Sequence, residues 1–326
     1  MSFTFLTFAV SAKDTPFHLI TQIPIKGQGG WDYLSIDAKN HRLFVSHSDR
    51  IVVVDTEKNQ IIKEILNTPG IHGVAAASDL NKAFSSDGKE GMVGVIELTN
   101  LTLKSKIKVG ENPDTILYEP SQHEVYAFNN RGNSVSVIDA KSEKVIATIP
   151  LPGRPEFGAV DVAAKKIYVN IEDKNSIVSI DTLAHKVVST WPLPGCEGPS
   201  GLALNTKSHH LYSVCVNEKM VMIDSNDGHL ISSAETGKGT DAAEFDPDLN
   251  LAFSSNGKSG TITVVKDLTD KLSVVENVKS QLGARTMILD PIDHHLYLIT
   301  ADFKPAKEGK RPKPVDGTQR VLVYGQ

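Results

Sequence analysis

The chain contains a sequence unit that recurs about every 42 residues. In each copy a Val-Ile-Asp-like segment is followed by a short turn, a second aliphatic segment and a Gly/Pro-containing loop. The Asp position of the unit falls at Asp55, Glu97, Asp139, Asp181, Asp224 and Lys266, with spacings of 42, 42, 42, 43 and 42 residues. The next copy, VLVYGQ, places Gly325 there after 59 residues, so about 17 residues are inserted before it. A period of this length is typical of a repeat fold in which each unit packs against its neighbours.

Each unit has the pattern of β-strands throughout. The third unit has four runs rich in Val, Ile, Tyr and Thr, at 115–118, 124–129, 134–138 and 144–149, separated by turn residues. No long apolar period of 3.6 residues is present, so we expect few helices. Four short antiparallel strands in about 40 residues are typical of a β-propeller blade. The first, innermost strand of each blade is expected to begin at or just after Trp31, His72, Asp114, Glu156, Ser200, Asp241 and Arg285, which gives seven blades.

The beginning of the chain is expected to complete the seventh blade. Residues 18–24, HLITQIP, match residues 144–150, KVIATIP, position by position. We therefore expect residues near 17–23 to pair with 320–324 and close the ring, which removes exposed sheet edges. The prediction is an all-β, seven-bladed β-propeller that occupies residues 14–326 as a single domain, with an insertion at 302–318 in blade seven.

Residues 1–12, MSFTFLTFAVSA, are apolar and end in small residues, as a secretory signal peptide does, although the basic beginning is missing. We expect either a signal-peptide remnant, cleaved after Ala12, or a mobile tail or extra edge strand. The first alternative predicts an exported protein, periplasmic or secreted. No window approaches 18 uncharged apolar residues, so no membrane span is expected. The net charge of −5 provides no attraction for nucleic acid or anionic membranes.

Two segments show a resemblance to a known family. They are NSVSVIDAKSEKVIATIPLPGRP, residues 133–155, and KKIYVNIEDKNSIVSIDTLAHKVVSTWP, residues 165–192. They resemble the repeats of the YVTN-repeat, WD40-like β-propellers, the YncE-like family, and the resemblance extends over residues 17–326. It implies a seven-bladed propeller that is secreted, periplasmic or surface-bound, in a family whose members mostly have no assigned reaction. The chain departs from the plain repeat in the blade-seven insertion and in polar residues at two sets of loop positions.

These polar loop positions predict a site on the propeller axis. The first and second strands of a blade are antiparallel, so the loop that enters the first and the loop that leaves the second lie on one face. All these loops converge on the axis, and ligand sites form where several elements converge. The candidate ligand-binding residues at or beside these positions are Trp31, Asp32, His72, Asp114, Glu156, Glu172, Glu197, Asp241 and Arg285.

His72 is the strongest single candidate because it lies among glycines and small residues in PGIHGVA, where a structural histidine has little to pack on. Its imidazole is a candidate general base or metal ligand, and His47 is a second candidate metal ligand. Glu156 and Arg285 are charges directed into a narrow channel, where they either meet a ligand or neutralise each other. Trp31 either contacts a ligand or covers the end of the core. The histidines at 209–210 and 294–295 fall in turns on the opposite face and are expected to be solvated.

Two main functions remain open at this point, and a third, weaker alternative is protein–protein interaction through the outer loops. The first is a non-catalytic scaffold that binds a small polar ligand, a metal ion or a peptide in the axial funnel. The second is a lyase, isomerase or hydrolase in which His72 is a general base or metal ligand, Glu156 and Glu197 are acid/base partners and Arg285 binds an anion. The candidate cofactor is a divalent metal ion, although simple binding needs none, and a monomer is expected. Phosphate-loop, dinucleotide-binding, nucleophile-elbow and His-Glu-x-x-His motifs are absent from the sequence.

Cys196 and Cys215 are expected to meet, because they begin and end one hairpin of blade five. In an exported chain they favour a disulfide that closes a 20-residue loop. The alternative is a thiolate pair that forms a soft-metal site with His72 or His47.

The insertion at 302–318 is rich in basic residues and proline, which predicts an exposed segment on the funnel face. It is expected to be either a solvated loop or a basic lid that draws anions toward the axis. Its basic residues are Lys304, Lys307, Lys310, Arg311 and Lys313.

Overall fold

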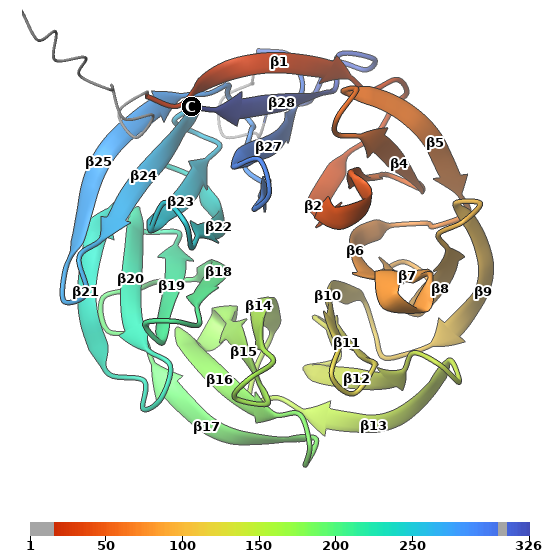
Figure 1. Ribbon diagram of the computed structural model, residues 1–326, viewed down its shortest axis with the longest axis horizontal. Helices are drawn as coiled ribbons and strands as arrows, with labels where there is room; N and C mark the ends of the chain where they lie inside the picture. The colour runs from red at the N-terminus through yellow and green to blue at the C-terminus, as the bar shows by residue number, and fades with distance from the viewer. Residues whose placement is uncertain (1–15, 306–311) are drawn as a thin grey trace, which may run out of the picture.

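The computed structural model describes residues 16–305 and 312–326, so the predictions for residues 1–12 lie outside the described residues. Seven four-stranded antiparallel sheets form a ring around a central axis (Figure 1). The helical elements of the described chain are three 3₁₀ turns, η2 Ala38–Asn40, η3 Ser78–Leu80 and η4 Glu172–Lys174. None of the described helices is long and apolar enough to cross a membrane. The prediction of an all-β, seven-bladed propeller is confirmed.

In six of the blades the strands run from the axis to the rim in chain order (Figure 1). Blade one contains β2 Trp31–Asp37, β3 Arg42–His47, β4 Arg50–Asp55 and β5 Gln60–Leu66. Blade two contains β6 Ile71–Ala77, β7 Lys82–Asp87, β8 Met92–Glu97 and β9 Thr102–Lys108. Blade three contains β10 Pro113–Glu119, β11 Glu124–Asn129, β12 Ser134–Asp139 and β13 Lys144–Pro150.

The remaining blades follow the same plan. Blade four contains β14 Pro155–Asp161, β15 Lys166–Ile171, β16 Ser176–Asp181 and β17 Lys186–Pro192. Blade five contains β18 Pro199–Asn205, β19 His210–Cys215, β20 Lys219–Asp224 and β21 Leu230–Glu235. Blade six contains β22 Thr240–Asp246, β23 Leu251–Asn256, β24 Thr261–Asp267 and β25 Leu272–Lys279. Blade seven contains β26 Met287–Asp290, β27 His295–Thr300, β28 Arg320–Gly325 and β1 His18–Pro24.

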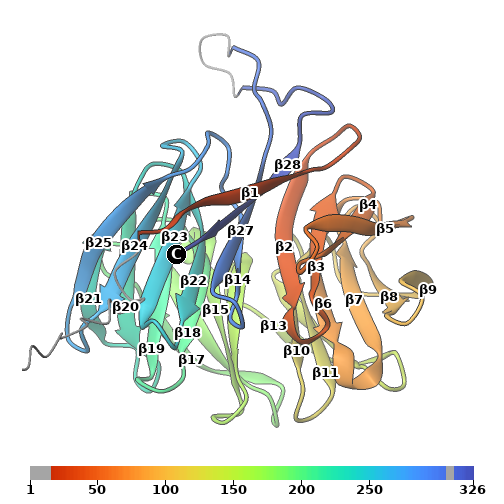
Figure 2. The same cartoon turned by 45° about the horizontal axis from the view of Figure 1, so that its top comes forward.

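The outer strand of blade seven comes from the beginning of the chain. β1 pairs antiparallel with β28, with Ile23 opposite Val321 and His18 opposite Gly325. β1 therefore crosses the rim beside β28, as Figure 2 shows. Ile23 is only 3% exposed and packs into the cluster between blades seven and one. The predicted closure of the ring is confirmed.

The hydrophobic core is divided among the interfaces between blades. Within the described chain, seven clusters of buried side chains form, and each joins two neighbouring blades. Between blades one and two, for example, Phe44 and Val53 pack with Val74 and Ala83. The two middle strands of a blade are covered on both faces, which explains why β4 and its counterparts are runs of β-branched residues. Each blade is therefore stabilised by its neighbours.

Tyrosines in the second strands of blades three and four link each of these blades to the next. The hydroxyl of Tyr126 donates to the Thr182 carbonyl at 3.4 Å, and that of Tyr168 donates to the Ser225 carbonyl at 3.0 Å. Both carbonyls lie just after the third strand of the following blade. These bonds give polar partners to phenols that are almost fully buried, which a buried hydroxyl requires.

The Asp of the repeat holds the turn after the third strand. The Asp139 carboxylate accepts a hydrogen bond from the Ser142 amide at 2.6 Å, and the Asp181 carboxylate accepts bonds from Leu183 and Ala184 at 2.9 and 2.8 Å. These are the local bonds by which aspartate favours turns. The repeated Asp is therefore a structural residue, as its recurrence predicts.

The prediction that the histidines of the opposite face are solvated is wrong for His210. This side chain is buried, and its Nδ1 lies 2.7 Å from Oδ2 of Asp267 in the next blade. His294 is half-buried in the same way, with Nδ1 at 2.7 Å from Asp246. The partners come from another blade, so the burial of these histidines depends on how the blades pack and not on the turns that contain them.

The contribution of β1 is testable with two isoleucines on the same strand. Ile23→Ala removes a buried side chain and should lower the free energy of unfolding by about 2–5 kcal/mol. Ile20 is 44% exposed, so Ile20→Ala should change that free energy by less than about 1 kcal/mol. Urea denaturation of both variants measures the difference. Equal effects would contradict the role of β1 as the strand that closes the ring.

Candidate functional site

Charged side chains gather at one mouth of the propeller axis. Five of them are the second residues of inner strands and the sixth lies just before β26; they are Asp32, His72, Asp114, Glu156, Asp241 and Arg285. They come from blades one, two, three, four, six and seven, and blade five has Ser200 at the equivalent place. We call these six charged residues the axial ring. The structure thus brings together residues separated by as many as 253 positions in the sequence, since 285 − 32 = 253.

A recurrent irregularity of the inner strands accompanies the axial ring. In blades one to six the pairing register of the first and second strands shifts at this position, for example between Ile71 and Val74 and between Pro113 and Ile116. A shift of this kind redirects side chains and is common beside functional sites. It explains why one residue near the start of each inner strand is half-buried at the axis rather than packed between blades.

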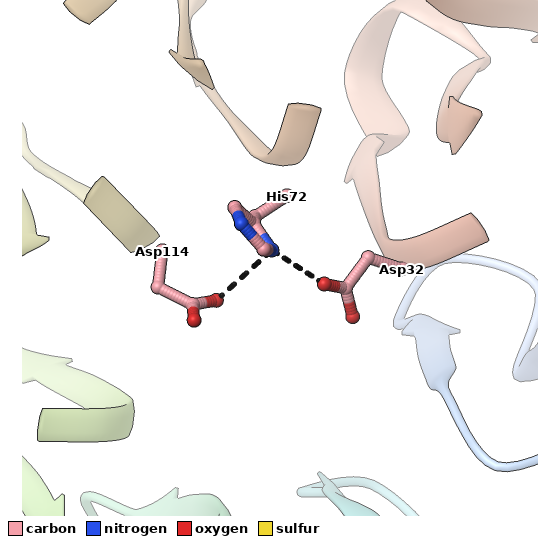
Figure 3. Close-up of side chains that lie close together, drawn as sticks. All are labelled: Asp32, His72 and Asp114. Atoms are coloured by element: carbon pink, nitrogen blue, oxygen red, sulfur yellow. Dashed lines mark hydrogen bonds and ion pairs between the residues drawn. The ribbon is translucent and has the colours of Figure 1, made fainter. Parts of the chain in front are cut away.

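His72 lies between two carboxylates from the neighbouring blades (Figure 3). Its Nδ1 is 2.6 Å from Oδ2 of Asp32 and 3.5 Å from Oδ1 of Asp114. On the side of Nε2, the side-chain oxygen of Asn112 lies nearby, next to Gly88. All three members of the charged cluster are largely buried, with 25% of His72, 23% of Asp32 and 13% of Asp114 exposed.

Arg285 is the permanent cation of the axial ring. Its guanidinium donates to Oδ2 of Asp241 at 3.0 Å, and a second nitrogen lies 3.8 Å from Oδ1 of Asp32. The alternative that Glu156 and Arg285 form an ion pair with each other is wrong. The ion-pair partners of Arg285 are Asp241 and Asp32. The excess of carboxylates in the axial ring therefore remains.

An aromatic contact across the axis forms the floor of the mouth. The Tyr33 ring of blade one meets the Phe157 ring of blade four, with 5.1 Å between centroids. The Tyr33 hydroxyl also donates to Oε1 of Glu156 at 3.3 Å, and Asn130 donates to its Oε2 at 3.4 Å. Because blades one and four are not neighbours, this contact bridges the axis below the charged residues.

A cavity of about 320 Å³ continues along the inner strands beneath this floor. Its walls are mainly apolar and include Ile36, Ala76, Leu117 and Ile288, with Tyr33 and Phe157 among the lining residues. The axis therefore has a charged mouth on one side of the aromatic pair and an apolar chamber on the other.

Crowding of carboxylates perturbs their protonation. Burial, together with the charges of Asp32 and Asp241, raises the pKa of Asp114 to about 7. Burial raises the pKa of Asp241 to about 6, and burial and the neighbouring carboxylates raise the pKa of Glu156 well above its usual range. Burial opposes the charged form of His72, but the Asp32 hydrogen bond and the Asp114 charge outweigh it and raise its pKa. The axial ring thus contains more carboxyl groups than cationic groups, and the raised pKa values show that bound protons compensate part of this excess.

Four predicted candidates lie apart from the axial ring. Trp31 packs on the cluster between blades seven and one, with its ring 6.2 Å from that of Phe303, which fits the alternative that it covers the core. Glu172 pairs with Arg154 at 2.9 Å just outside the axial ring, where its charge helps to raise the pKa of Glu156 and of Asp241, and Glu197 is exposed. His47 is fully buried in β3, where burial and Arg50 lower its pKa to about 4. Among the described residues, the cluster able to hold a metal contains His72 but not His47.

Three residues near the axis were not predicted. Tyr33 and Asn112 lie next to Asp32 and close to Asp114 in the sequence, but the spacing of the repeat does not predict the direction of their side chains. Glu244 lies on β22, half-buried, and the Leu289 backbone amide of blade seven is a hydrogen-bond partner. Burial raises its pKa to about 8. The signal in the sequence is an isolated acid in the otherwise small and apolar run AAEF.

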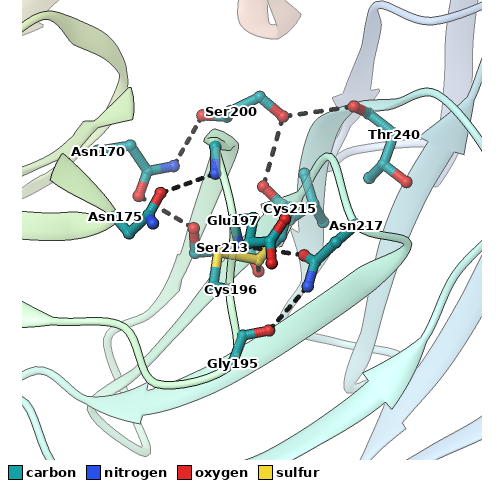
Figure 4. The surroundings of a disulfide bond; sticks show 12 residues. Asn170, Asn175, Gly195, Cys196, Glu197, Ser200, Ser213, Cys215, Asn217 and Thr240 are labelled. Carbon is teal, nitrogen blue, oxygen red and sulfur yellow. Dashed lines mark hydrogen bonds between the residues drawn. A yellow bond between two sulfur atoms is a disulfide. The ribbon is translucent and has the colours of Figure 1, made fainter. Parts of the chain in front are cut away.

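The predicted disulfide between Cys196 and Cys215 is present, and Figure 4 shows its surroundings. Both cysteines are buried, with Cα atoms 5.4 Å apart. The disulfide ties the loop that enters β18 to the end of β19, and Asn217 adds bonds to the same loop through Glu197 and Gly195. The alternative of a thiolate metal site is therefore wrong.

The base of the insertion in blade seven is packed, which the sequence did not predict. Phe303 pairs with Pro314 in an isolated β-bridge, and the Lys304 amide donates to the Lys313 carbonyl at 2.9 Å. Contact of Phe303 with Trp31 places this base on the same face as the charged mouth. Lys307, Lys310 and Arg311 lie outside the described residues, so the choice between solvated loop and basic lid stays a prediction.

Comparison with known proteins identifies partial relatives. No protein-family model matches the chain. "Uncharacterized protein YncE" of Salmonella typhi is 30% identical over 128 residues, which is 37% of this chain and 36% of that protein. The protein of the same name in Salmonella typhimurium is 29% identical over the same shares. The match therefore spans about a third of the length of these curated relatives.

Solved structures share the fold over nearly the whole chain. A chain of Kuenenia stuttgartiensis hydrazine synthase has a TM-score of 0.72 and 14% identity, and covers 90% of this chain and 96% of its own. The structure of U3-55K has a TM-score of 0.76 and 9% identity, and covers 92% and 98%. At these identities the likeness concerns the fold alone. The seven-bladed ring and the partial similarity to YncE fit a YncE-like propeller family.

Neutralising Glu244 should stabilise the protein increasingly as pH rises. Its carboxyl pKa is about 8 in the fold against an ordinary 4.5, so between these values the folded protein holds a proton that the unfolded chain has released. Wild-type stability therefore falls as pH rises through this window, and Glu244→Gln, which cannot ionise, avoids that loss. The gain should be near zero at about pH 4.5 and on the order of 2–4 kcal/mol at about pH 8.5.

Urea denaturation at both pH values measures this gain. Glu197→Gln, which changes an exposed carboxyl, should show a small effect that does not vary with pH in this way. If Glu244→Gln stabilised the protein equally at both pH values, the raised pKa of the Glu244 carboxyl would be refuted.

Removing the disulfide should destabilise the fold without changing its architecture. The double substitution Cys196→Ala and Cys215→Ala should lower the free energy of unfolding by about 3 kcal/mol, because the unfolded chain gains the freedom of an open loop. Urea denaturation of oxidised, reduced and variant protein measures this loss. Thiol alkylation under denaturing conditions, followed by intact mass, checks the native bond. Two alkylated cysteines in unreduced protein from an oxidising compartment would contradict it.

Proposed function

We propose that this protein is a non-catalytic, ligand-binding β-propeller whose axial mouth takes a small cation. The observation that supports this proposal is the charge balance of the axial ring. Asp32, Asp114, Glu156 and Asp241 share the mouth with one permanently charged cation, Arg285. Even when His72 is protonated, the carboxylates outnumber the cationic groups.

A cation would relieve an arrangement that is unfavourable without one. Carboxylates removed from water and placed near one another repel, unless opposite charge or protons compensate them. The carboxyl groups of the mouth are largely removed from water, which strengthens their attraction for a cation. A concave, negatively charged mouth also concentrates cations from solution.

The state of His72 favours binding over acid–base catalysis. A general base needs a ring nitrogen directed at the substrate. In His72, Nδ1 already faces Asp32 and Asp114, and the side-chain oxygen of Asn112 lies on the side of Nε2. The lyase, isomerase or hydrolase alternative therefore has less support than a binding function.

We further propose that the protein acts outside the cytoplasm, in the periplasm or as a secreted protein. The Cys196–Cys215 disulfide supports this, since such bonds persist in oxidising compartments. The partial similarity to YncE is compatible with the same location.

The binding proposal predicts selective stabilisation by cations. Thermal unfolding of the full chain is measured with manganese chloride, zinc chloride, spermidine and arginine, and with citrate and glucose as anionic and neutral probes. At least one cationic probe should raise Tm by several degrees at about 100 times its Kd, because binding to the folded state adds about 2.7 kcal/mol there. Citrate and glucose should leave Tm unchanged.

The double substitution Glu156→Gln and Asp241→Asn locates the effect, because it removes two ionisable carboxyl groups from the mouth. It should weaken stabilisation by cations, while Glu197→Gln, a matched loss of an exposed carboxylate, should retain it. Stabilisation by citrate or glucose alone, or equal stabilisation of all three proteins by cations, would contradict a cation site at the mouth.

A further inference from the structure

We propose that Asp32, His72 and Asp114 bind one divalent transition-metal ion, such as Mn²⁺ or Zn²⁺. The inference rests on the proposed function, because it names the class of cation and its ligands. One potential ligand atom from each residue lies within 4.8 Å of the others, and the three come from the inner strands of three consecutive blades. Figure 3 shows the two carboxylates on either side of the imidazole.

The arrangement around Nδ1 of His72 is better explained by an ion than by hydrogen bonding. Oδ2 of Asp32 and Oδ1 of Asp114 approach this same nitrogen, at 2.6 and 3.5 Å. A single N–H can be directed well at one of the two oxygens. A metal ion bound to the unprotonated nitrogen can be shared by both carboxylates, so it satisfies all three groups at once.

Asp114 lacks the partners that a carboxylate in its position normally has. It is only 13% exposed, yet within residues 16–305 and 312–326 its side chain accepts no hydrogen bond. Its one charged contact in that part of the chain is the longer approach to His72. Its oxygens are not fully enclosed, so a coordinated ion can reach them and supply the partner that the described residues do not.

Residues that would not bind the metal themselves lie beside the other two ligands, His72 and Asp32. Such neighbours commonly position the ligands of a metal site. The side chain of Asn112 lies beside the imidazole: Nε2 of His72 and Oδ1 of Asn112 are 2.6 and 3.1 Å from the point where a Cβ of residue 88 would lie. A ligating histidine usually donates its second N–H to an oxygen. Arg285 approaches Oδ1 of Asp32, which leaves Oδ2 directed at His72.

The donor set selects the class of metal. One imidazole nitrogen and two carboxylate oxygens suit Mn²⁺ or Zn²⁺, whereas Mg²⁺ and Ca²⁺ prefer oxygen ligands alone. Three protein ligands leave at least one coordination position for water or for part of a bound molecule. The open position would face the charged mouth.

Gly88 provides a way to disturb the site without changing its charge. A Cβ at this residue would lie 2.6 Å from Nε2 of His72 and 3.1 Å from Oδ1 of Asn112. The backbone of Gly88 is not in the left-handed region, so alanine can adopt it. Gly88→Ala should therefore displace the imidazole while all ligand types remain present.

The test uses the full chain after treatment with a chelator and exchange into metal-free buffer. Calorimetric titration with Mn²⁺ and with Zn²⁺ gives stoichiometry and Kd, and the electron paramagnetic resonance signal of Mn²⁺ reports its coordination. We expect one equivalent of Mn²⁺ or Zn²⁺ to bind, and Mg²⁺ to bind at least about 10-fold more weakly. Asp114→Asn and His72→Gln should abolish this binding, and Gly88→Ala should raise Kd by about 10- to 100-fold. Glu197→Gln should bind as wild type.

Circular dichroism and Tm identify any variant that fails to fold, and Asp114→Asn, which keeps the shape of the side chain, is the decisive variant. Unchanged stoichiometry and Kd in folded Asp114→Asn and His72→Gln would overturn the assignment of ligands. Failure of Mn²⁺ and Zn²⁺ to bind wild type, while spermidine or arginine still stabilises it through the axial ring, would overturn the metal inference and leave the proposed function standing. Failure of every cation would reject both.

Discussion

Face-to-face packing between neighbouring blades is the interaction on which the rest of the structure depends. Each middle strand is covered on both sides by other blades, so the apolar clusters lie between sheets and no blade has a core of its own. All the apolar clusters are buried only when the interface between blade seven and blade one has also formed. β1 makes the final addition by pairing with β28, and Ile23 and Ile25 enter the cluster that joins blade seven to blade one. Polar links such as Tyr168 to Ser225 then fix the angle between blades.

The same closed ring creates the charged mouth. The inner strands of all seven blades surround one axis, so equivalent positions of these strands lie next to one another there. The register shifts of blades one to six turn the residues at these positions inward. Here the position is occupied by different residues. Asp32 and Asp114 flank His72, while Asp241 pairs with Arg285, so one side of the mouth has the unsatisfied carboxylate and the other an ion pair. The seven-fold scaffold therefore supports a site without seven-fold symmetry.

The repeat predicted most of the fold and the membership of the axial ring, because both follow from local spacing. The match of 18–24 to 144–150 was enough to predict ring closure, and the shared position before each inner strand was enough to group His72 with Asp114. Side-chain direction was not predictable in the same way. Tyr33 reaches Phe157 across the axis, and His210 is buried by Asp267 of another blade. Glu197 is exposed in a loop held by the disulfide and Asn217. Each of these depends on contacts between segments far apart in the sequence.

The pairing of β1 with β28 has a consequence for the order of events during synthesis. β1 is the first described strand to leave the ribosome, and its partner is the last. Six blades can form as their strands emerge, but β1 has no edge to join until the end of the chain arrives. Until then its residues that are buried in the closed ring, Ile23 among them, have no cluster to enter. A chain interrupted before β28 therefore leaves both β1 and an inner sheet edge unpaired, and such an edge can pair with another chain.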